Sequence, residues 1–356
     1  GRGTQIAQDY LDAMRLGFEE NTQAKVLDRP AVLVTREVDA PPVGEIHASV
    51  DAWRELANTA LPMAIVGPSR SEAAKVLREE ITATAMPTIS HCGTMDFGGH
   101  FNISLGNGAF GDEAPILSDF HRRRGHKVGV IRETNVAGDE TFEMFRLAAR
   151  EHRTHVVGDQ TIDNFASVAA IAEKLNLLHA AGADAIQYFG NGTNAKNFVT
   201  ALNDCARSLN WKVSKVLNTA FVLRHPGWGE AAITPADLEG WIGLDQISER
   251  NAVCKAMLDR FEKRYGRRPF HAYAALGWDT ANVLAIATAR SKPHWREGFK
   301  AGMEKVRWLA SAVGGPASFI SIGLYDHRGY KGNYLVLREI RNGVDQIVDV
   351  PTLLTE

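Results

Sequence analysis

The sequence predicts an α/β fold of two lobes, each a mainly parallel sheet flanked by helices. The chain has 356 residues, of which 45% are hydrophobic, and this is more than one core comfortably serves. From Ala64 onward, short apolar strands alternate with helical patterns, as in parallel sheets with helices on both faces. After Gly240, three helical segments come without strands of their own. They must cover a sheet made by earlier residues, so the chain crosses between lobes more than once.

Apolar periodicity places the individual elements. Helices are predicted at about residues 3–20, 49–59, 71–84, 114–124, 137–152, 165–182, 195–209, 252–265, 272–289 and 295–308. Strands are predicted at residues 31–37, 64–66, 127–133, 155–162 and 184–190, with further short strands before Ser90, at "SKVLNTAF" and at "WIGLDQISE". The tail reads as strand, turn and strand, and Asn342-Gly343 is a hairpin signal.

The charge balance argues against nucleic acid or an anionic membrane as a partner. The chain has 40 Lys and Arg against 42 Asp and Glu, a formal net charge of -2, so no basic field would gather a polyanion. No apolar run approaches the 18 or so residues of a membrane helix, and we expect no direct membrane insertion. The chain begins at Gly1 with no recognisable signal peptide, so localisation has to be argued indirectly.

The cysteines do not suggest a metal or redox site. Cys92, Cys205 and Cys254 are far apart and lack CxxC spacing. Buried thiols are the simplest interpretation, and a disulfide between Cys205 and Cys254 stays open.

Two hydroxyl-rich loops follow two predicted strands, at Ser69-Arg70-Ser71 and at His91-Cys92-Gly93-Thr94. The first opens a helix, whose amide groups favour a carboxylate or another anion, and Arg70 could add a bidentate partner. The alternative is that a serine is only a helix cap. Ligands of open parallel sheets bind at the carboxyl ends of strands, where both loops lie.

Other kinds of site fit the sequence less well. Neither GxGxxG nor GxxxxGK[ST] occurs, which argues against a nucleotide. A Cys92 nucleophile with His91 as base is disfavoured, because adjacent residues on an extended chain point to opposite sides. Two histidine pairs, His121 with His126 and His152 with His155, have no carboxylate or thiolate set in metal spacing and are predicted to be surface residues. We therefore expect no enzyme activity, no cofactor and no metal.

Seven segments in order resemble a known family, the type I periplasmic binding proteins, in their branched-chain amino acid-binding branch that serves ABC transporters. They are "AIVGPSRS", "MPTISHCGT", "KVGVIRETNVAGDETF", "GADAIQYFGNGTNAKNFVTAL", "LEGWIGLDQ", "HAYAALGWDTANVLAIA" and "YLVLREIRNG". We expect the family's first strand, which precedes its opening helix, to be absent from this sequence. The resemblance implies lobe 1 at 1–105 and 248–320 and lobe 2 at 106–247 and 321–356, with three hinge crossovers near 103–108, 243–248 and 318–326.

The resemblance also implies function: a solute-binding protein, periplasmic or extracellular, which closes on a small molecule between its lobes and delivers it to an ABC permease. A ligand-sensing domain of an amide-type regulator or receptor is the alternative. The implied ligand-binding residues are Ser69, Arg70, Ser71, Cys92, Gly93, Thr94, Phe189, Asn191, Thr219, Phe221 and Tyr273.

One departure bears on the ligand. Amino acid-binding members of the family hold the ligand ammonium with an acidic residue after the strand that here reads "SKVLNTAF", but residues 218–222 include no Asp or Glu. A buried ammonium without an anionic partner would be costly. We therefore expect an aromatic or other organic acid that lacks a free α-amino group.

Overall fold

A computed structural model describes residues 4–39 and 44–348. The chain divides into two compact units, of which unit 1 is Gly1–Asn107 with Gln246–Leu335 and unit 2 is Gly108–Asp245 with Val336–Glu356. The first two changes of unit fall within the predicted ranges. The third falls between Leu335 and Val336, so residues 321–335 belong to unit 1 rather than to the second lobe. The late helices lie in unit 1, as their lack of strands predicts.

Unit 1 contains a short parallel sheet in the order β1-β2-β3 and an antiparallel sheet in the order β11-β10-β9. Its helices are α1 (Gln5–Gln23), α2 (Ile46–Glu55), α3 (Ser71–Ala83), α8 (Ala252–Tyr265), α9 (Ala272–Arg290) and α10 (Arg296–Met303), with short turns η1 (Leu56–Ala60) and η2 (Met95–Phe97). Its strands are β1 (Ile65–Val66), β2 (Thr88–Ser90), β3 (Asn102–Ser104), β9 (Leu309–Ala310), β10 (Phe319–Ile320) and β11 (Tyr330–Lys331).

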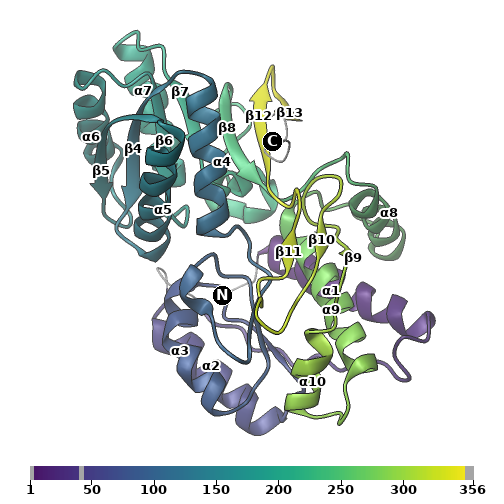
Figure 1. Cartoon of the computed structure of the whole chain (residues 1–356). Helices are drawn as coiled ribbons and strands as arrows, with labels where there is room; N and C mark the ends of the chain where they lie inside the picture. Colours follow the sequence, from purple (N-terminus) through teal and green to yellow (C-terminus); the bar gives the residue numbers. More distant parts are fainter. Residues whose placement is uncertain (1–3, 40–43, 349–356) are drawn as a thin grey trace. The chain divides into compact units, whose positions relative to one another are not determined.

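Helices α1 and α9 of unit 1 pack closely along each other (Figure 1). A Cβ atom added at Gly277 would stand 2.3 Å from the carbonyl oxygen of Tyr10, and one added at Gly17 would stand 2.8 Å from the Ala281 side chain. Glycine is therefore required where the two backbones approach. This close packing fixes the two helices that carry Tyr10 and Tyr273.

Unit 2 is built on a seven-stranded sheet in the order β13-β12-β8-β7-β6-β4-β5. Its strands are β4 (Lys127–Glu133), β5 (His155–Ile162), β6 (Ala185–Phe189), β7 (Ser214–Leu217), β8 (Trp241–Asp245), β12 (Val336–Arg341) and β13 (Val344–Ile347). Its helices are α4 (Phe110–Arg123), α5 (Val136–His152), α6 (Val168–Ala180) and α7 (Ala195–Ser208), with short turns η3 (Thr219–Arg224) and η4 (Pro226–Ala231). Strands β4 to β8 are parallel, and β12 and β13 form the predicted antiparallel hairpin at Asn342-Gly343.

The predicted strand at Ala31 to Glu37 is wrong. The segment has no regular secondary structure, and Val32 and Val34 are 87% and 51% exposed. Its apolar alternation is typical of a strand, but a strand also needs a partner for its backbone groups. Within the described residues, none pairs with this segment. The prediction also missed β3, whose three residues are too short to show a period.

Of the four histidines predicted to be surface residues, His121 differs from the prediction. His121 is fully buried rather than on the surface, and its ring nitrogens lie 3.1 Å from Gln187 Oε1 and 3.0 Å from His126 Nδ1. Burial lowers the pKa of His121 to about 3. The three cysteines are buried and form no disulfide. In the described ranges, no group of three His, Cys, Asp or Glu side chains could hold a metal ion.

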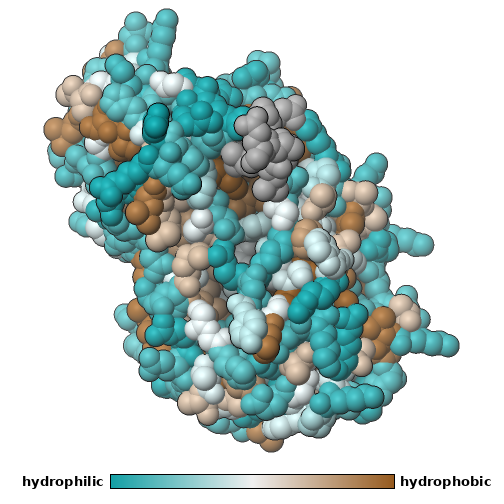
Figure 2. Space-filling model, viewed as in Figure 1, coloured by the Kyte–Doolittle hydropathy of each residue, from teal (hydrophilic) through white to brown (hydrophobic). Residues whose placement is uncertain are grey.

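None of the helices in the described part of the chain is both long and apolar enough to cross a bilayer. On the face drawn in Figure 2, hydrophilic residues predominate and the hydrophobic ones are scattered.

Candidate functional site

The loops that follow β1, β2 and β3 lie together at one edge of unit 1, because the three strands are parallel. Ser90 links the first two loops: its hydroxyl donates to the Pro68 carbonyl oxygen at 2.5 Å and accepts from the Cys92 N–H at 3.1 Å. The Asn107 N–H donates to the His91 carbonyl oxygen at 2.9 Å and joins the third loop to the second. The edge is therefore a preformed, hydrogen-bonded surface.

His91 is buried at this edge and is held neutral. Its Nδ1 lies 2.6 Å from the Leu105 carbonyl oxygen and its Nε2 lies 2.8 Å from the Tyr10 hydroxyl. A carbonyl oxygen can only accept, so Nδ1 carries the hydrogen and Nε2 accepts from Tyr10. Burial lowers the pKa of His91 to about 4. Both ring nitrogens are therefore engaged, and His91 cannot act as a base for Cys92.

Arg70 and Tyr273 belong to the same edge. The Asn107 side-chain amide donates to the Tyr273 hydroxyl at 2.8 Å. Burial raises the pKa of Tyr273, and the positive charge of Arg70 opposes this increase. Tyr273 on α9 thus lies within electrostatic reach of the guanidinium at the start of α3.

The N-terminus of α3 faces this loop without a side-chain cap. Arg70 is the residue at the cap position, and its side chain makes no capping hydrogen bond. The alternative that Ser69 or Ser71 is the cap is therefore wrong: Ser69 is exposed, and Ser71 is the buried first residue of the helix. An uncapped helix start beside an arginine is a favourable place for an anion.

Cys92, Gly93 and Thr94 form a buried loop after β2. The Thr94 hydroxyl accepts from the Asp96 N–H at 3.1 Å and so caps the short turn η2. Because that bond uses an oxygen lone pair, the hydroxyl hydrogen of Thr94 is not part of it.

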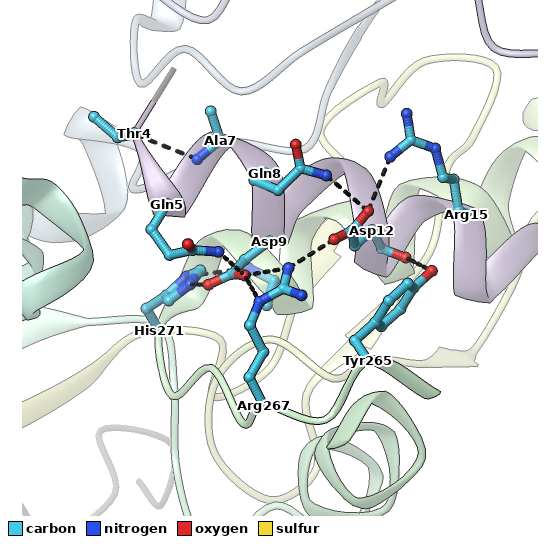
Figure 3. Close-up of polar contacts among 11 residues, drawn as sticks. Thr4, Gln5, Ala7, Gln8, Asp9, Asp12, Arg15, Tyr265, Arg267 and His271 are labelled. Carbon is cyan, nitrogen blue, oxygen red and sulfur yellow. Dashed lines mark hydrogen bonds and ion pairs between the residues drawn. The ribbon is translucent and has the colours of Figure 1, made fainter. Parts of the chain in front are cut away.

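A charged network fixes the helices that carry the two tyrosines (Figure 3). Arg267 donates to Asp9 at 2.8 Å and to Asp12 at 2.6 Å, and His271 Nε2 lies 3.1 Å from Asp9. Burial alone would raise the pKa of Asp9, but hydrogen bonds from His271, Gln5 and Arg267 outweigh it and lower the pKa. Because Tyr10 follows Asp9 and Tyr273 lies two residues after His271, this network holds both tyrosines in place.

The loops after β4, β6 and β7 gather at one edge of unit 2 in the same way. Glu133, the last residue of β4, accepts from the N–H groups of Asn191 at 2.8 Å and Asn194 at 2.6 Å, and from the Asn135 amide at 2.8 Å. It also accepts a short hydrogen bond from the Tyr188 hydroxyl. Glu133 therefore sets the conformation of the loop that carries Asn191.

A second buried carboxylate, that of Glu113 on α4, lies beside Thr219. The Thr219 hydroxyl lies 3.2 and 3.3 Å from the two carboxylate oxygens, and the Thr219 N–H lies 3.4 Å from one of them. Residues 218–222 have no acidic side chain, but the fold brings one to Thr219 from more than a hundred positions away. The absence in the sequence therefore does not leave this place without a carboxylate.

Two predicted ligand contacts are part of the interior of unit 2. Phe189 and Phe221 are both fully buried. Phe189 packs on Phe145, with ring centroids 5.1 Å apart, and Phe221 lies in the core under the Arg224 guanidinium. Neither ring has exposed surface for a ligand, so neither supports an aromatic ligand.

Two other acidic residues are engaged elsewhere. Asp245 pairs with Arg224 at 2.5 Å in unit 2. Asp279, in unit 1, accepts from the Ser311 hydroxyl at 2.6 Å and from the Ala312 N–H at 2.9 Å. Burial raises the pKa of Asp279 to about 6.

The structure thus brings Arg70, Ser71, the loop 92–94 and Tyr273 together in unit 1, and Asn191 and Thr219 at the edge of unit 2. Sequence reasoning missed Tyr10, Asn107, Glu113 and Glu133. The signal for Glu133 was a lone carboxylate at the end of an apolar strand. Glu113 carried no such signal, since an acidic residue in the first turn of a helix is ordinary.

The chain belongs to a known family. The family model described as periplasmic binding protein matches residues 1–339. No curated protein sequence matches the chain.

Solved structures share the fold over nearly the whole chain, at identities that support the fold alone. An ABC transporter substrate-binding protein from Desulfitobacterium hafniense, in complex with leucine, is 18% identical with a TM-score of 0.76, covering 95% of each chain. The branched-chain amino acid transporter substrate binding protein LivJ from Streptococcus pneumoniae, in complex with isoleucine, is 19% identical with a TM-score of 0.71, covering 96% of this chain and 94% of that one. An ABC transporter solute binding protein from R. palustris, in complex with benzoate, is 19% identical with a TM-score of 0.69, covering 97% and 92%.

Proposed function

We propose that the protein is the solute-binding component of an ABC uptake system, acting outside the cytoplasmic membrane, and that it binds a small carboxylic acid and delivers it to a permease. The observation that carries the choice of ligand is the uncapped start of α3 with Arg70 at the cap position, close to Tyr273. The sequence-based expectation that the ligand is enclosed by closing lobes is part of the proposal.

The charge of the unit 1 edge supports a carboxylate. His91 is neutral, so the arginine and the helix start are the positive features of the loop. A guanidinium binds a carboxylate through two parallel hydrogen bonds, and helix-start amides add to them. A neutral sugar would leave the arginine without a partner.

The ligands named for the structural relatives support the same class. Leucine, isoleucine and benzoate differ in shape and in the amino group, but each carries a carboxylate. We infer that the carboxylate is the feature this chain selects for. The expectation of an acid without an α-amino group rested on the absence of Asp and Glu from residues 218–222. In the structure, however, the carboxylate of Glu113 lies beside Thr219. The proposal is accordingly the wider class of small carboxylic acids.

Titration calorimetry with the Arg70→Gln variant tests this function. Benzoate, leucine, isoleucine and hydroxyisocaproate would be titrated into the ligand-stripped protein. Loss of the guanidinium should weaken any acid that binds by about tenfold to a hundredfold, since hydrogen bonds to charged groups contribute about 1.5–3 kcal/mol.

The matched control is Arg150→Gln, which makes the same change of charge on an exposed residue in the last turn of α5. It should leave binding unchanged. Equal affinity of the wild type and the Arg70→Gln variant for every acid that binds would remove the proposed carboxylate site.

A further inference from the structure

Glu113 is a buried carboxylate with unusually few hydrogen-bond donors. Its side chain is fully excluded from solvent. Across residues 4–39 and 44–348, Thr219 is the one hydrogen-bond donor to it, at distances of 3.2 to 3.4 Å. Buried carboxylates ordinarily have several short partners, because a charge without them is costly. That Thr219 alone among the described residues donates to it, through long hydrogen bonds, points to a role other than stability.

The packing holds Glu113 against Thr219. A Cβ atom added at Gly108 would stand 2.1 Å from the Glu113 carboxylate and 2.9 Å from the Thr219 methyl group. Glycine at this position, with φ at +77°, is what allows the two side chains to meet. The pair therefore depends on the backbone where unit 2 begins.

The pair also fixes the direction of the Thr219 hydroxyl. An ionised carboxylate only accepts, so both the N–H and the O–H of Thr219 donate to Glu113. The Thr219 oxygen then offers lone pairs alone to any third group. Thr219 is only partly buried and follows β7 at the polar edge of unit 2.

We propose that Glu113 is a positioning residue that turns Thr219 into an obligate hydrogen-bond acceptor, so that the protein selects acids carrying an O–H or N–H donor in addition to the carboxylate. This inference rests on the proposed function and adds a second requirement to it. An acid without such a donor gives the Thr219 oxygen no hydrogen bond. An acid with an ether or keto oxygen at that place is disfavoured, because its lone pairs would face the lone pairs of the Thr219 oxygen.

The charged surroundings make the direction of this hydroxyl depend on pH. Burial raises the pKa of Glu113 to about 7, and the nearby Asp112 on the same helix adds to the increase. On the facing turn η3, Thr219 is followed by apolar residues up to Arg224, whose guanidinium pairs with Asp245 and Asp345. When protonated, Glu113 donates to Thr219, and the Thr219 hydrogen becomes available to an acceptor on the ligand.

Matched ligand pairs test the proposal by calorimetry at about pH 8 and about pH 5.5. The pairs are para-hydroxybenzoate with para-methoxybenzoate, and hydroxyisocaproate with ketoisocaproate. For the wild type at the higher pH, the donor member of a pair should bind about tenfold more tightly, as one hydrogen bond allows. The ratio should fall several-fold at the lower pH.

Two variants assign the effect to this pair of residues. Thr219→Val should abolish the donor preference at both pH values, and Glu113→Gln should make the preference independent of pH. A preference that keeps its pH dependence in Thr219→Val overturns the proposal, as does equal binding of both members of each pair by the wild type. If no acid binds the wild type, the proposed function fails as well, so the two failures are distinguishable.

Discussion

Two buried glutamates of unit 2 differ sharply in how they are bound. Glu133 accepts four hydrogen bonds from Asn191, Asn194, Asn135 and Tyr188, and the three whose donors are nitrogens are 2.6 to 2.8 Å long. In the described part of the chain, Glu113 has only the longer contacts from the N–H and O–H of Thr219, at 3.2 to 3.4 Å. The same side chain at the same depth therefore serves two purposes. Because Glu133 accepts four hydrogen bonds, it is a structural support for a loop. Glu113 has few hydrogen bonds, so its protonation state and the direction of the Thr219 hydroxyl can both change.

The largest expected effect on stability follows from substituting Glu133. Glu133→Gln replaces an acceptor by an amide whose N–H groups oppose the donors around it. The free energy of unfolding should fall by about 4 kcal/mol, the scale of breaking a buried charged network. Urea denaturation at neutral pH measures it. The exposed Glu143→Gln on α5 is the control and should change little; a loss no larger than this control would contradict the structural role of Glu133.

Glu113→Gln should have the opposite effect in a defined pH range. The folded-state pKa of about 7 lies above the ordinary 4.5, so above pH 4.5 the unfolded chain releases a proton that the folded protein keeps until about pH 7. Wild-type stability therefore falls over this range, by about 3 kcal/mol at most. The variant should be more stable than the wild type at pH 8 and not at pH 4.5. Thermal unfolding at both pH values checks this. A variant that is less stable than the wild type at pH 8 would show that Glu113, like Glu133, is a structural support.

His91 extends the comparison to a buried base with both partners satisfied. Its pKa of about 4 lies below the ordinary 6.5, so the unfolded chain binds a proton first as the pH falls. The contribution of His91 to stability is thus complete above pH 6.5 and decreases by about 2 kcal/mol at pH 5. His91→Gln should reduce the acid sensitivity of unfolding by that amount. An unchanged pH profile would show that His91 is not neutral in the folded protein.

The smallest effect should come from Thr219→Val. The variant removes the hydroxyl that hydrogen-bonds with Glu113 and keeps the shape of the side chain. Because the contacts are long and Glu113 can stay protonated, the free energy of unfolding at pH 6 should fall by about 1 kcal/mol or less. Chemical denaturation at that pH measures the loss. A cost as large as that of Glu133→Gln would mean that Thr219 is structural and would remove the contrast between the two glutamates.

Local sequence pattern predicted most of the fold. Strands 127–133 and 155–162 and the helix 252–265 agree with the structure at both ends, because apolar period and capping residues are encoded within each segment. The strand predicted at 31–37 is not formed, because a strand needs a pairing partner elsewhere in the chain. The prediction missed β3, because its three residues are too few to show the apolar period of a strand.

The site was predictable only where it lies in one loop. Arg70 and the segment 92–94 follow strands directly, so their place at the carboxyl edge could be inferred. The meeting of Glu113 with Thr219 depends on packing across the unit and could not be. Phe189 and Phe221 were misassigned because an aromatic residue near a strand end fits a core as well as a ligand contact.

The central claim is that this protein binds a small acid through its carboxylate, and one measurement addresses it most directly. Thermal unfolding would be followed with benzoate and leucine and with the corresponding amides, benzamide and leucinamide, which lack the carboxylate, on the wild type and on Arg70→Gln. At about 100 times its dissociation constant, a bound acid adds roughly 2.7 kcal/mol of stability. The account predicts that an acid stabilises the wild type, that its amide does not, and that Arg70→Gln loses the response; amides that stabilise as well as acids would contradict it.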